Sequence, residues 1–418
     1  MSLGKVHIIG AGLSGLSAAV ALAGEGVEVE VSEAAAWAGG RCRSYVDPQL
    51  GMTIDNGNHL VLSGNRAVMD YLARIGASDR LEGPAVARFD FADVSTGERW
   101  TLRPSEGPLP GWILDPRRRV PGTRPADYLS LLPLLWPRAG RRIDEIVTGR
   151  GPLWDRLMHP FLLAVLNTEP EAGSADLAAA VLRETLARGG RAFRPRIAQP
   201  SLGAAFVEPA LAYLAARGGQ VRLGRRARAL RFGASRLEAV VMADGEVAIA
   251  PGEAVVLAAP PWVAAELVPE LTVPNEFRAI VNGHFKLAPP PGASPMVAVV
   301  GGTAEWIFAF EDRLSVTVSG ADRLLDVDRQ TLAARLWADV ARVHGLPPEL
   351  PTWQIVKERR AAFAATPAQN ARRPYARTRW GNLLLAGDWT RTGLPATIEG
   401  ALRSGRTAAD LVLARRAN

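Results

Sequence analysis

The chain has 418 residues, of which 48% are apolar, and carries a formal net charge of +7. This length predicts two or three packed domains, and the lack of a long uncharged apolar run argues against a transmembrane helix. Cys42 is the only cysteine, so an internal disulfide cannot form, which fits a reducing compartment. The first expected strand leaves no room for a signal peptide, and we expect a cytoplasmic protein.

Residues 4–33 have the pattern of a strand, a helix and a second strand, with a glycine fingerprint between the first two elements. Gly10 permits a tight turn, Gly12 lets the backbone approach a pyrophosphate closely, and Gly15 lets the helix pack on the sheet. The helix would point its N-terminal N–H groups at the phosphates. This context predicts a nucleotide-binding βαβ unit.

Glu33 ends the second strand, where a carboxylate can accept hydrogen bonds from both hydroxyls of an adenosine ribose. The same carboxylate would repel a 2′-phosphate, which disfavours an NADP-type dinucleotide; a surface turn acid is the alternative interpretation. The dinucleotide contacts that we expect in this unit are Gly10, Gly12, Leu13, Ser14, Gly15, Glu33 and Ala34.

The segment from 70 to 200 is rich in proline, tryptophan and arginine and shows little alternation, which predicts an inserted lobe. Its most apolar part runs from Tyr128 to Trp136 and is followed by Arg138, Arg141 and Arg142. This part is too short to span a bilayer. Two interpretations remain open: a buried helix kinked by proline, or an interfacial segment with leucine and tryptophan in lipid and arginine at the headgroups.

From about residue 200 the pattern of the nucleotide-binding region returns. We expect a helix over 206–217, strands over 220–224, 227–230 and 254–259, and a hairpin turn near 243–246. Residues 270–370 form a second excursion, with β-like runs at 296–300 and 314–318 and a helix over 329–344.

Near the C-terminus, an apolar strand over 382–386 ends at Gly387 and Asp388, and a final helix opens after Pro395. An acid at this point can bind the ribityl hydroxyls of a flavin, with helix capping as the alternative. The helix N-terminus can bring N–H groups toward the negative end of an isoalloxazine ring. Glu399 could face that ring or cap a helix.

Together with Gly39-Gly40-Arg41, these motifs resemble the FAD-dependent amine oxidase and carotenoid desaturase superfamily, and they span the chain in the expected order. A narrower resemblance is to the hydroxysqualene dehydroxylases, squalene-associated flavoproteins of bacterial hopanoid pathways. The segments that carry the narrower resemblance are 55–59, 166–168 with Ser174 and Ala175, 201–203, and 357–361 with Phe363.

The resemblance implies an α/β fold: a Rossmann-like FAD-binding domain of the glutathione reductase and amine oxidase type, an inserted α+β substrate domain and a helical lobe. The FAD-binding domain would comprise 1–70, 200–270 and 375–418, and the substrate-binding, lipid-facing domain 71–199 and 271–374. Further FAD contacts implied are Gly39, Gly40, Arg41, Asn56, Gly57, Asn58, His59, Ala227, Ala259, Pro260, Gly387, Asp388, Pro395, Ala396, Thr397 and Ile398.

The activity implied is the reductive removal of the allylic hydroxyl of hydroxysqualene to give squalene, with hydride from reduced flavin N5 quenching an allylic cation. This chemistry needs an apolar tunnel, a dry site and a proton for the leaving oxygen. His59 is the candidate acid or substrate positioner, and Asp55 is a weaker candidate that would rather order the backbone.

Several alternatives remain. The chain could instead be an oxidising desaturase or amine oxidase, or a prenyl-chain escort protein without catalysis. No metal-ligand motif or nucleic-acid module is present, and no second glycine fingerprint offers an NAD(P)H site, so a separate reductase or reductant would supply electrons. The basic charge and the 128–142 segment favour peripheral contact with the inner face of the cytoplasmic membrane.

Overall fold

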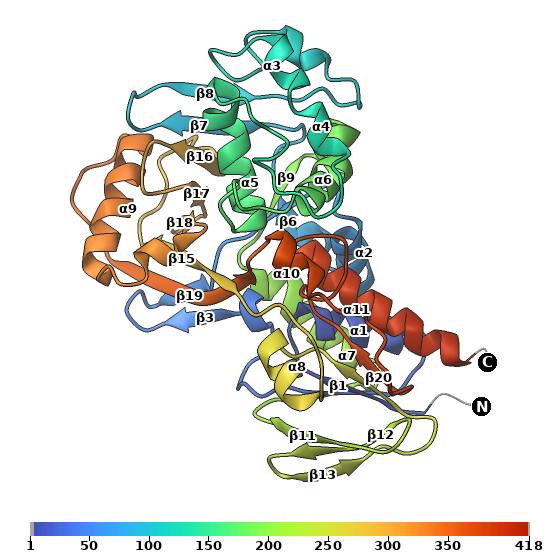
Figure 1. Cartoon of the computed structure of the whole chain (residues 1–418). Helices are drawn as coiled ribbons and strands as arrows, with labels where there is room; N and C mark the ends of the chain where they lie inside the picture. Colours follow the sequence, from blue (N-terminus) through green and yellow to red (C-terminus); the bar gives the residue numbers. More distant parts are fainter. Residues whose placement is uncertain (1–3, 417–418) are drawn as a thin grey trace.

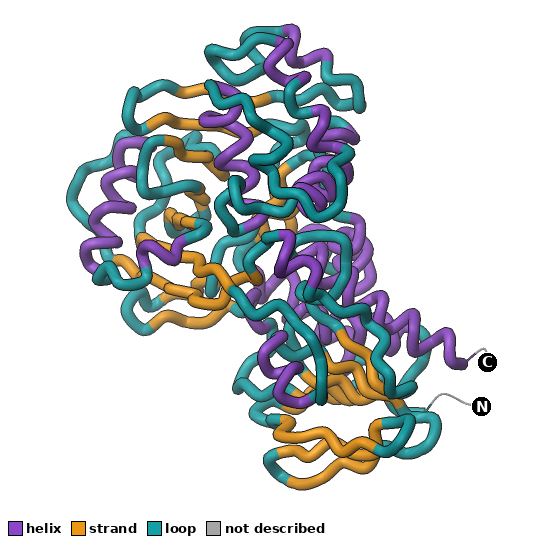
Figure 2. The backbone as a smooth tube through the Cα atoms, viewed as in Figure 1, coloured by secondary structure: helices purple, strands orange, loops and turns teal. Residues whose placement is uncertain are grey.

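The computed structural model describes residues 4–416. Figure 2 shows two separate groups of strands, with helices between and around them. Among the described residues, no helix combines the length and the apolar character that crossing a bilayer would require.

The first group of strands is a five-stranded parallel sheet in the order β10-β2-β1-β14-β20. Its strands are β1 (Val6–Ile9), β2 (Val29–Ser32), β10 (Gln220–Arg222), β14 (Ala254–Leu257) and β20 (Leu383–Leu385). Taken in chain order, this is a doubly wound sheet whose strand order reverses beside β1. Ligands of such sheets bind beyond the carboxyl ends of the strands at that point.

The helices beside this sheet are α1 (Leu13–Gly24), α2 (Arg66–Ile75), α7 (Glu208–Ala215) and α11 (Ile398–Leu413). The first and last of them, α1 and α11, pack side by side (Figure 1). They approach so closely that a Cβ atom on Gly405 would lie 2.1 Å from the backbone oxygen of Ser14. This contact holds the start of the chain against its end.

A small antiparallel sheet extends from the parallel one at the end of the molecule that carries both termini (Figure 1). It consists of β11 (Ala227–Phe232), β12 (Leu237–Met242) and β13 (Gly245–Ala248). The helix α8 (Pro261–Leu267) follows β14.

The second group of strands is a seven-stranded sheet in the order β19-β15-β18-β17-β16-β7-β8. Its strands are β7 (Phe89–Asp93), β8 (Arg99–Leu102), β15 (Phe277–Phe285), β16 (Met296–Val300), β17 (Trp306–Ala309), β18 (Leu314–Val318) and β19 (Trp353–Phe363). The helix α9 (Arg329–His344) covers one face, where Phe285 and Trp337 pack together. The opposite face, with Trp306 and Phe308, packs in the same apolar cluster as the helical lobe.

The helical lobe contains α3 (Pro125–Leu129), α4 (Leu132–Leu135), α5 (His159–Leu166) and α6 (Ala175–Glu184). Short elements connect it to the rest: β3 (Ser44–Asp47) with β4 (Met52–Asp55), the three-stranded sheet of β5 (Leu60–Leu62), β9 (Pro195–Ala198) and β6 (Leu81–Glu82), and α10 (Pro367–Ala371). Figure 1 places α3 at the end of the molecule opposite to β11–β13.

The structure confirms the expected α/β class, and the strands of the parallel sheet come from all three stretches assigned to one domain. Two expectations differ in detail. The helix expected over 206–217 starts with a π-helical turn, Gly203–Val207, before α7. The segment 128–136 forms two short helices rather than one, since Pro133 has no N–H group to continue a helix from α3 into α4.

The close contact between α1 and α11 predicts a large effect of one added methyl group. Gly405→Ala should lower the free energy of unfolding by at least about 2 kcal/mol, because its Cβ would overlap the Ser14 carbonyl. The matched control is Gly149→Ala, whose Cβ meets no atom within 4 Å and should change stability by less than about 0.5 kcal/mol. Urea titration measures both, and equal effects would contradict the helix contact.

Candidate active site: a dinucleotide cradle built from both ends of the chain

The loop after β1 requires glycine at two positions. Gly10 has φ of 109°, and a Cβ there would lie 2.6 Å from the oxygen of Ala258. A Cβ on Gly15 would lie 1.9 Å from the oxygen of Gly10. Both glycines therefore let the loop turn tightly and let α1 pack on it, as the fingerprint predicts.

Gly12 faces open space, since a Cβ at that position would meet no atom within 4 Å. The neighbouring loop is held in place because Gly39 donates its N–H to the oxygen of Ala11 at 2.8 Å. No side chain caps α1 at Gly12, and its first turn contains no acidic residue. The N–H groups and the positive end of the helix are thus available to an anion, so these residues fit a pyrophosphate.

Glu33 is tied to the same loop. Its carboxylate accepts hydrogen bonds from the N–H groups of Ala11 at 2.7 Å and Ala35 at 2.8 Å. The backbone N–H of Arg225 donates to the backbone oxygen of Glu33 at 2.7 Å. This bond brings the segment before Ala227 next to the end of β2. Each carboxylate oxygen keeps a further lone pair, so Glu33 can still receive ribose hydroxyls.

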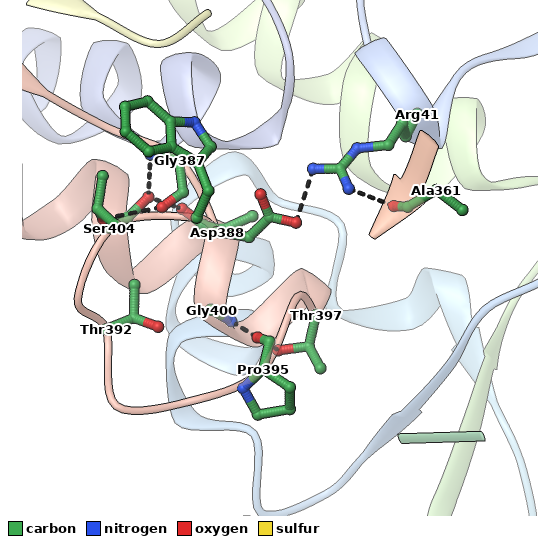
Figure 3. A network of polar contacts seen from close by, with 12 residues as sticks. Arg41, Ala361, Gly387, Asp388, Thr392, Pro395, Thr397, Gly400 and Ser404 are labelled. Carbon is green, nitrogen blue, oxygen red and sulfur yellow. Dashed lines mark hydrogen bonds and ion pairs between the residues drawn. The ribbon is translucent and has the colours of Figure 1, made fainter. Parts of the chain in front are cut away.

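An ion pair joins the N-terminal part of the chain to the C-terminal part (Figure 3). Arg41 contacts the carboxylate of Asp388 with a 2.6 Å separation, and the other end of its guanidinium donates to the oxygen of Ala361 on β19. Asp388 is buried, whereas Arg41 is partly exposed. Arg41 therefore contacts both the turn that follows β20 of the parallel sheet and strand β19 of the second sheet.

The turn at Gly387 and Asp388 is fixed from behind. Ser404 on α11 accepts a hydrogen bond from the N–H of Gly387 at 2.8 Å, and Trp389 donates its indole N–H to the oxygen of Ala259 at 3.0 Å. The buried Arg373 donates to the backbone oxygens of Asp388 at 3.1 Å and of Thr390. These contacts leave the Asp388 carboxylate directed toward Arg41 (Figure 3).

The final helix begins where the sequence predicts. Thr397 caps α11 by accepting a hydrogen bond from the N–H of Gly400 at 3.0 Å, and Pro395, Ala396 and Ile398 surround this N-terminus. Glu399 accepts hydrogen bonds from the N–H groups at the start of α2 and from Arg403. Its carboxylate thus caps a helix, which was one of its two expected roles.

The segment after β4 lies between the two groups of strands. Asn58 donates to the hydroxyl of Thr317 at 3.2 Å, and the side chain of Asn282 donates to the oxygen of Asn56 at 3.4 Å. A Cβ on Gly57 would lie 3.0 Å from Asn282. These residues fasten the segment to β15 and β18, which positions the following residue, His59.

Asp55 is fully engaged by protein groups. Its carboxylate accepts hydrogen bonds from the hydroxyl of Ser44 at 2.5 Å and from the N–H of Leu202 at 2.9 Å, and Arg313 lies 4.0 Å away. Burial raises the pKa of Asp55, against the effect of these donors. The carboxylate therefore orders the backbone at Leu202, which is the role that the sequence favoured over acid chemistry.

His59 is half-buried beside Arg41. Burial, together with the positive charge of Arg41, lowers the pKa of His59 to about 4. The imidazole is therefore neutral at pH 7 and donates a hydrogen bond at one ring nitrogen while it accepts one at the other. A neutral ring can orient a hydroxyl group, but it carries no extra proton for a leaving oxygen.

Three residues of the site escaped the sequence interpretation: Arg373, Ala361 and Asn282. Arg373 and Asn282 stand in no recognised motif, and Ala361 contributes only a backbone oxygen, so no local signal marked them. The segments 201–203 and 357–361 were noted only through the family resemblance. Their partners are Asp55 and Arg41, so they contact two residues of the candidate site.

One further cluster lies outside this site. The ligand atoms of His159, Glu169 and Glu171 lie within 4.8 Å of one another among the described residues. Arg150 pairs with Glu171 at 2.5 Å, so a cation already offsets part of the acidic charge.

This geometry is that of a flavoprotein. Residues 13–413 match the family of flavin-containing amine oxidoreductases, and the chain belongs to that family. Cyclohexylamine oxidase from Brevibacterium oxydans has the same fold, with a TM-score of 0.73, 15% identity and 100% of both chains covered.

Curated relatives are closer in sequence. A hydroxysqualene dehydroxylase from Rhodopseudomonas palustris is 55% identical over 410 residues, with 98% of each chain covered. Another, from Sinorhizobium fredii, is 52% identical over 409 residues, again with 98% of each chain covered.

The lowered pKa of His59 predicts a pH dependence of stability. The unfolded chain takes up a proton on this imidazole near pH 6.5 and the folded chain only near pH 4, so stability should fall as the pH decreases through this window. Replacing the imidazole by an amide that does not titrate, His59→Gln, should make the loss smaller by up to about 3 kcal/mol. Urea titrations of both proteins at pH 7 and pH 4.5 measure this difference, and parallel losses would show that His59 does not titrate in this way.

Proposed function

We propose that this chain removes the allylic hydroxyl of hydroxysqualene by FAD-dependent reduction and so produces squalene. The observation that carries the proposal is the identity of 49–55% with three hydroxysqualene dehydroxylases over almost the whole chain. The dinucleotide cradle supports it, because the loop at Gly10–Gly15, the Glu33 carboxylate and the start of α11 offer the geometry that a dinucleotide needs.

The proposed FAD-binding domain comprises 1–70, 200–270 and 375–418, and residues 71–199 and 271–374 form the proposed substrate side. In this assignment the loop at Gly10–Gly15 binds the pyrophosphate, Glu33 binds the ribose, and Asp388 with the N-terminus of α11 faces the flavin half. FAD bound there supplies, once reduced, the hydride that replaces the hydroxyl group.

The chain's own residues provide the environment that a carbon–oxygen bond cleavage needs. The lobe and the second sheet share a cluster of buried side chains, among them Phe193, Trp306 and Phe308. Such a surrounding excludes water, which would otherwise capture an allylic cation. A long hydrocarbon chain entering between the lobe and the second sheet would regain there the apolar contacts that it loses on leaving a membrane.

His59 is the proposed positioning residue for the substrate hydroxyl. As a neutral imidazole it can hold the hydroxyl by a hydrogen bond, and the positive charge of Arg41 beside it helps to keep the imidazole unprotonated. Asp55 supports this arrangement indirectly, since it fixes the backbone at Leu202 and the end of β4. The hydroxyl takes up one proton and leaves as water, so each turnover consumes one hydride and one proton.

The reaction can be tested without knowing the natural reductant. Anaerobic protein whose flavin has been reduced by light should be reoxidised by hydroxysqualene, with absorbance returning near about 450 nm. In D₂O the squalene formed should carry one deuterium at the former carbinol carbon, as read by mass spectrometry. Reduced protein without hydroxysqualene is the control.

Two other outcomes of this experiment would contradict the proposal. Reoxidation only by oxygen or a quinone would favour an oxidising desaturase or amine oxidase. Colourless protein that takes up no FAD would favour a non-catalytic prenyl-chain escort protein.

We further propose peripheral contact with the inner face of the cytoplasmic membrane. Half of the ten large apolar side chains that are exposed among the described residues belong to residues 109–136. They are Leu109, Leu114, Leu129, Leu132 and Trp136. Residues 109–142 also contain seven arginines and only two aspartates. Exposed apolar side chains among cations favour an anionic bilayer surface.

Vesicle binding tests this contact. The triple variant Leu129→Ser, Leu132→Ser, Trp136→Ser should bind phosphatidylglycerol vesicles roughly 100-fold more weakly than the original chain, because each exposed apolar side chain contributes burial energy. The control Leu223→Ser removes an exposed leucine from the parallel sheet's end of the molecule and should bind normally. Co-sedimentation measures both, and unchanged binding of a folded triple variant would refute the contact.

A further inference from the structure

A groove of about 460 Å³ lies on the far side of the turn that presents Asp388. Three segments line it: residues 375–377 before β20, residues 390–392 after Asp388, and one face of α11 with Ser404, Thr407 and Leu411. In Figure 3 Thr392 and Ser404 lie on one side of this turn, while the carboxylate of Asp388 points to Arg41 on the other.

The groove is positively charged and has no acid in its lining. Arg377 and Arg391 are exposed, and neither forms an ion pair within the described part of the chain. Arg391 rests on the ring of Tyr375, with 4.8 Å between its guanidinium carbon and the ring centre. The serine and threonine hydroxyl groups of the lining already donate to backbone oxygens, so the two exposed guanidinium groups are the donors that the groove offers to an anion.

One further arginine, Arg373, lies beneath the groove. Arg373 is buried and donates to the Thr392 hydroxyl at 2.9 Å, and no carboxylate lies within ion-pair distance of it among residues 4–416. Burial lowers the pKa of Arg373 to about 10; the negative charge of Asp388 opposes this shift, and the positive charge of Arg391 adds to it. The exposed Arg377 and Arg391, which have no carboxylate within ion-pair distance in the described part of the chain, favour the binding of an anion.

The same buried arginine connects the groove to the cofactor cradle. Its guanidinium donates both to the backbone oxygen of Asp388 and to the Thr392 hydroxyl at the groove. A ligand in the groove would therefore lie one layer of backbone behind the acid assigned to the flavin.

We propose that this groove binds a phosphate-bearing reduced nucleotide, with Arg377 and Arg391 on the phosphate and the exposed ring of Tyr375 against the base. The inference rests on the proposed function, which consumes two electrons in each turnover and has no second glycine fingerprint for their donor. A flavin mononucleotide and a nicotinamide dinucleotide share this chemistry. The bound FAD would accept two electrons and two protons from a reduced flavin mononucleotide, or one hydride from a reduced nicotinamide together with one solvent proton, and the donor would leave as its oxidised form.

Binding can be measured directly on protein loaded with FAD. Calorimetry with FMN, NADPH and inorganic pyrophosphate as three separate probes should give binding of at least one nucleotide. In the double variant Arg377→Gln, Arg391→Gln the affinity for the nucleotide should fall about tenfold or more, because two charge-assisted contacts are lost. The charge-matched control Arg329→Gln, Arg335→Gln removes two exposed arginines from α9 and should leave binding unchanged.

The outcomes are distinct from those of the dehydroxylation test. The double variant, once reduced by light, should still be reoxidised by hydroxysqualene, since the groove serves only the donor. Binding of FMN or of NADPH identifies which source fits. Absence of nucleotide binding, binding of pyrophosphate alone, or equal binding by the double variant would overturn the proposal.

Discussion

A buried carboxylate needs a cation, and in this protein that need joins regions that lie far apart in the sequence. Asp388 is surrounded by backbone contacts on one side, so its charge is balanced by Arg41 on the other. The same guanidinium reaches Ala361 in the second sheet. One arginine thereby fixes the relative positions of the glycine loops, the C-terminal turn and the edge strand of the substrate side.

Two glycines support this arrangement because they lack a Cβ atom, and not only because their backbone is flexible. Gly15 and Gly405 let α1 approach the loop before it and the helix beside it, because each occupies a position where a methyl group would overlap a carbonyl. The approach brings the starts of α1 and α11 to the same side of the parallel sheet. Two helix N-termini can then face the two halves of one dinucleotide.

Sequence reasoning predicted the local parts of this design well. Gly10, Gly15 and Glu33 lie within one βαβ unit, so their spacing alone defines a turn, a close contact and a strand end. Arg373 and Asn282 could not be found in this way, because their partners are distant in sequence and no short pattern fixes such contacts. The charge state of His59 also required the structure, since its pKa depends on burial and on Arg41.

The cradle has a consequence for how the protein is made. Arg41 and Asp388 are separated by 347 positions, so the first half of the cradle leaves the ribosome roughly 20 to 70 s before the second at ordinary synthesis rates. For the first part of that time β1 lacks its neighbour β14, and throughout it α1 lacks α11. Cofactor capture is therefore an event that follows translation, and nascent chains must keep an apolar helix protected until their last residues emerge.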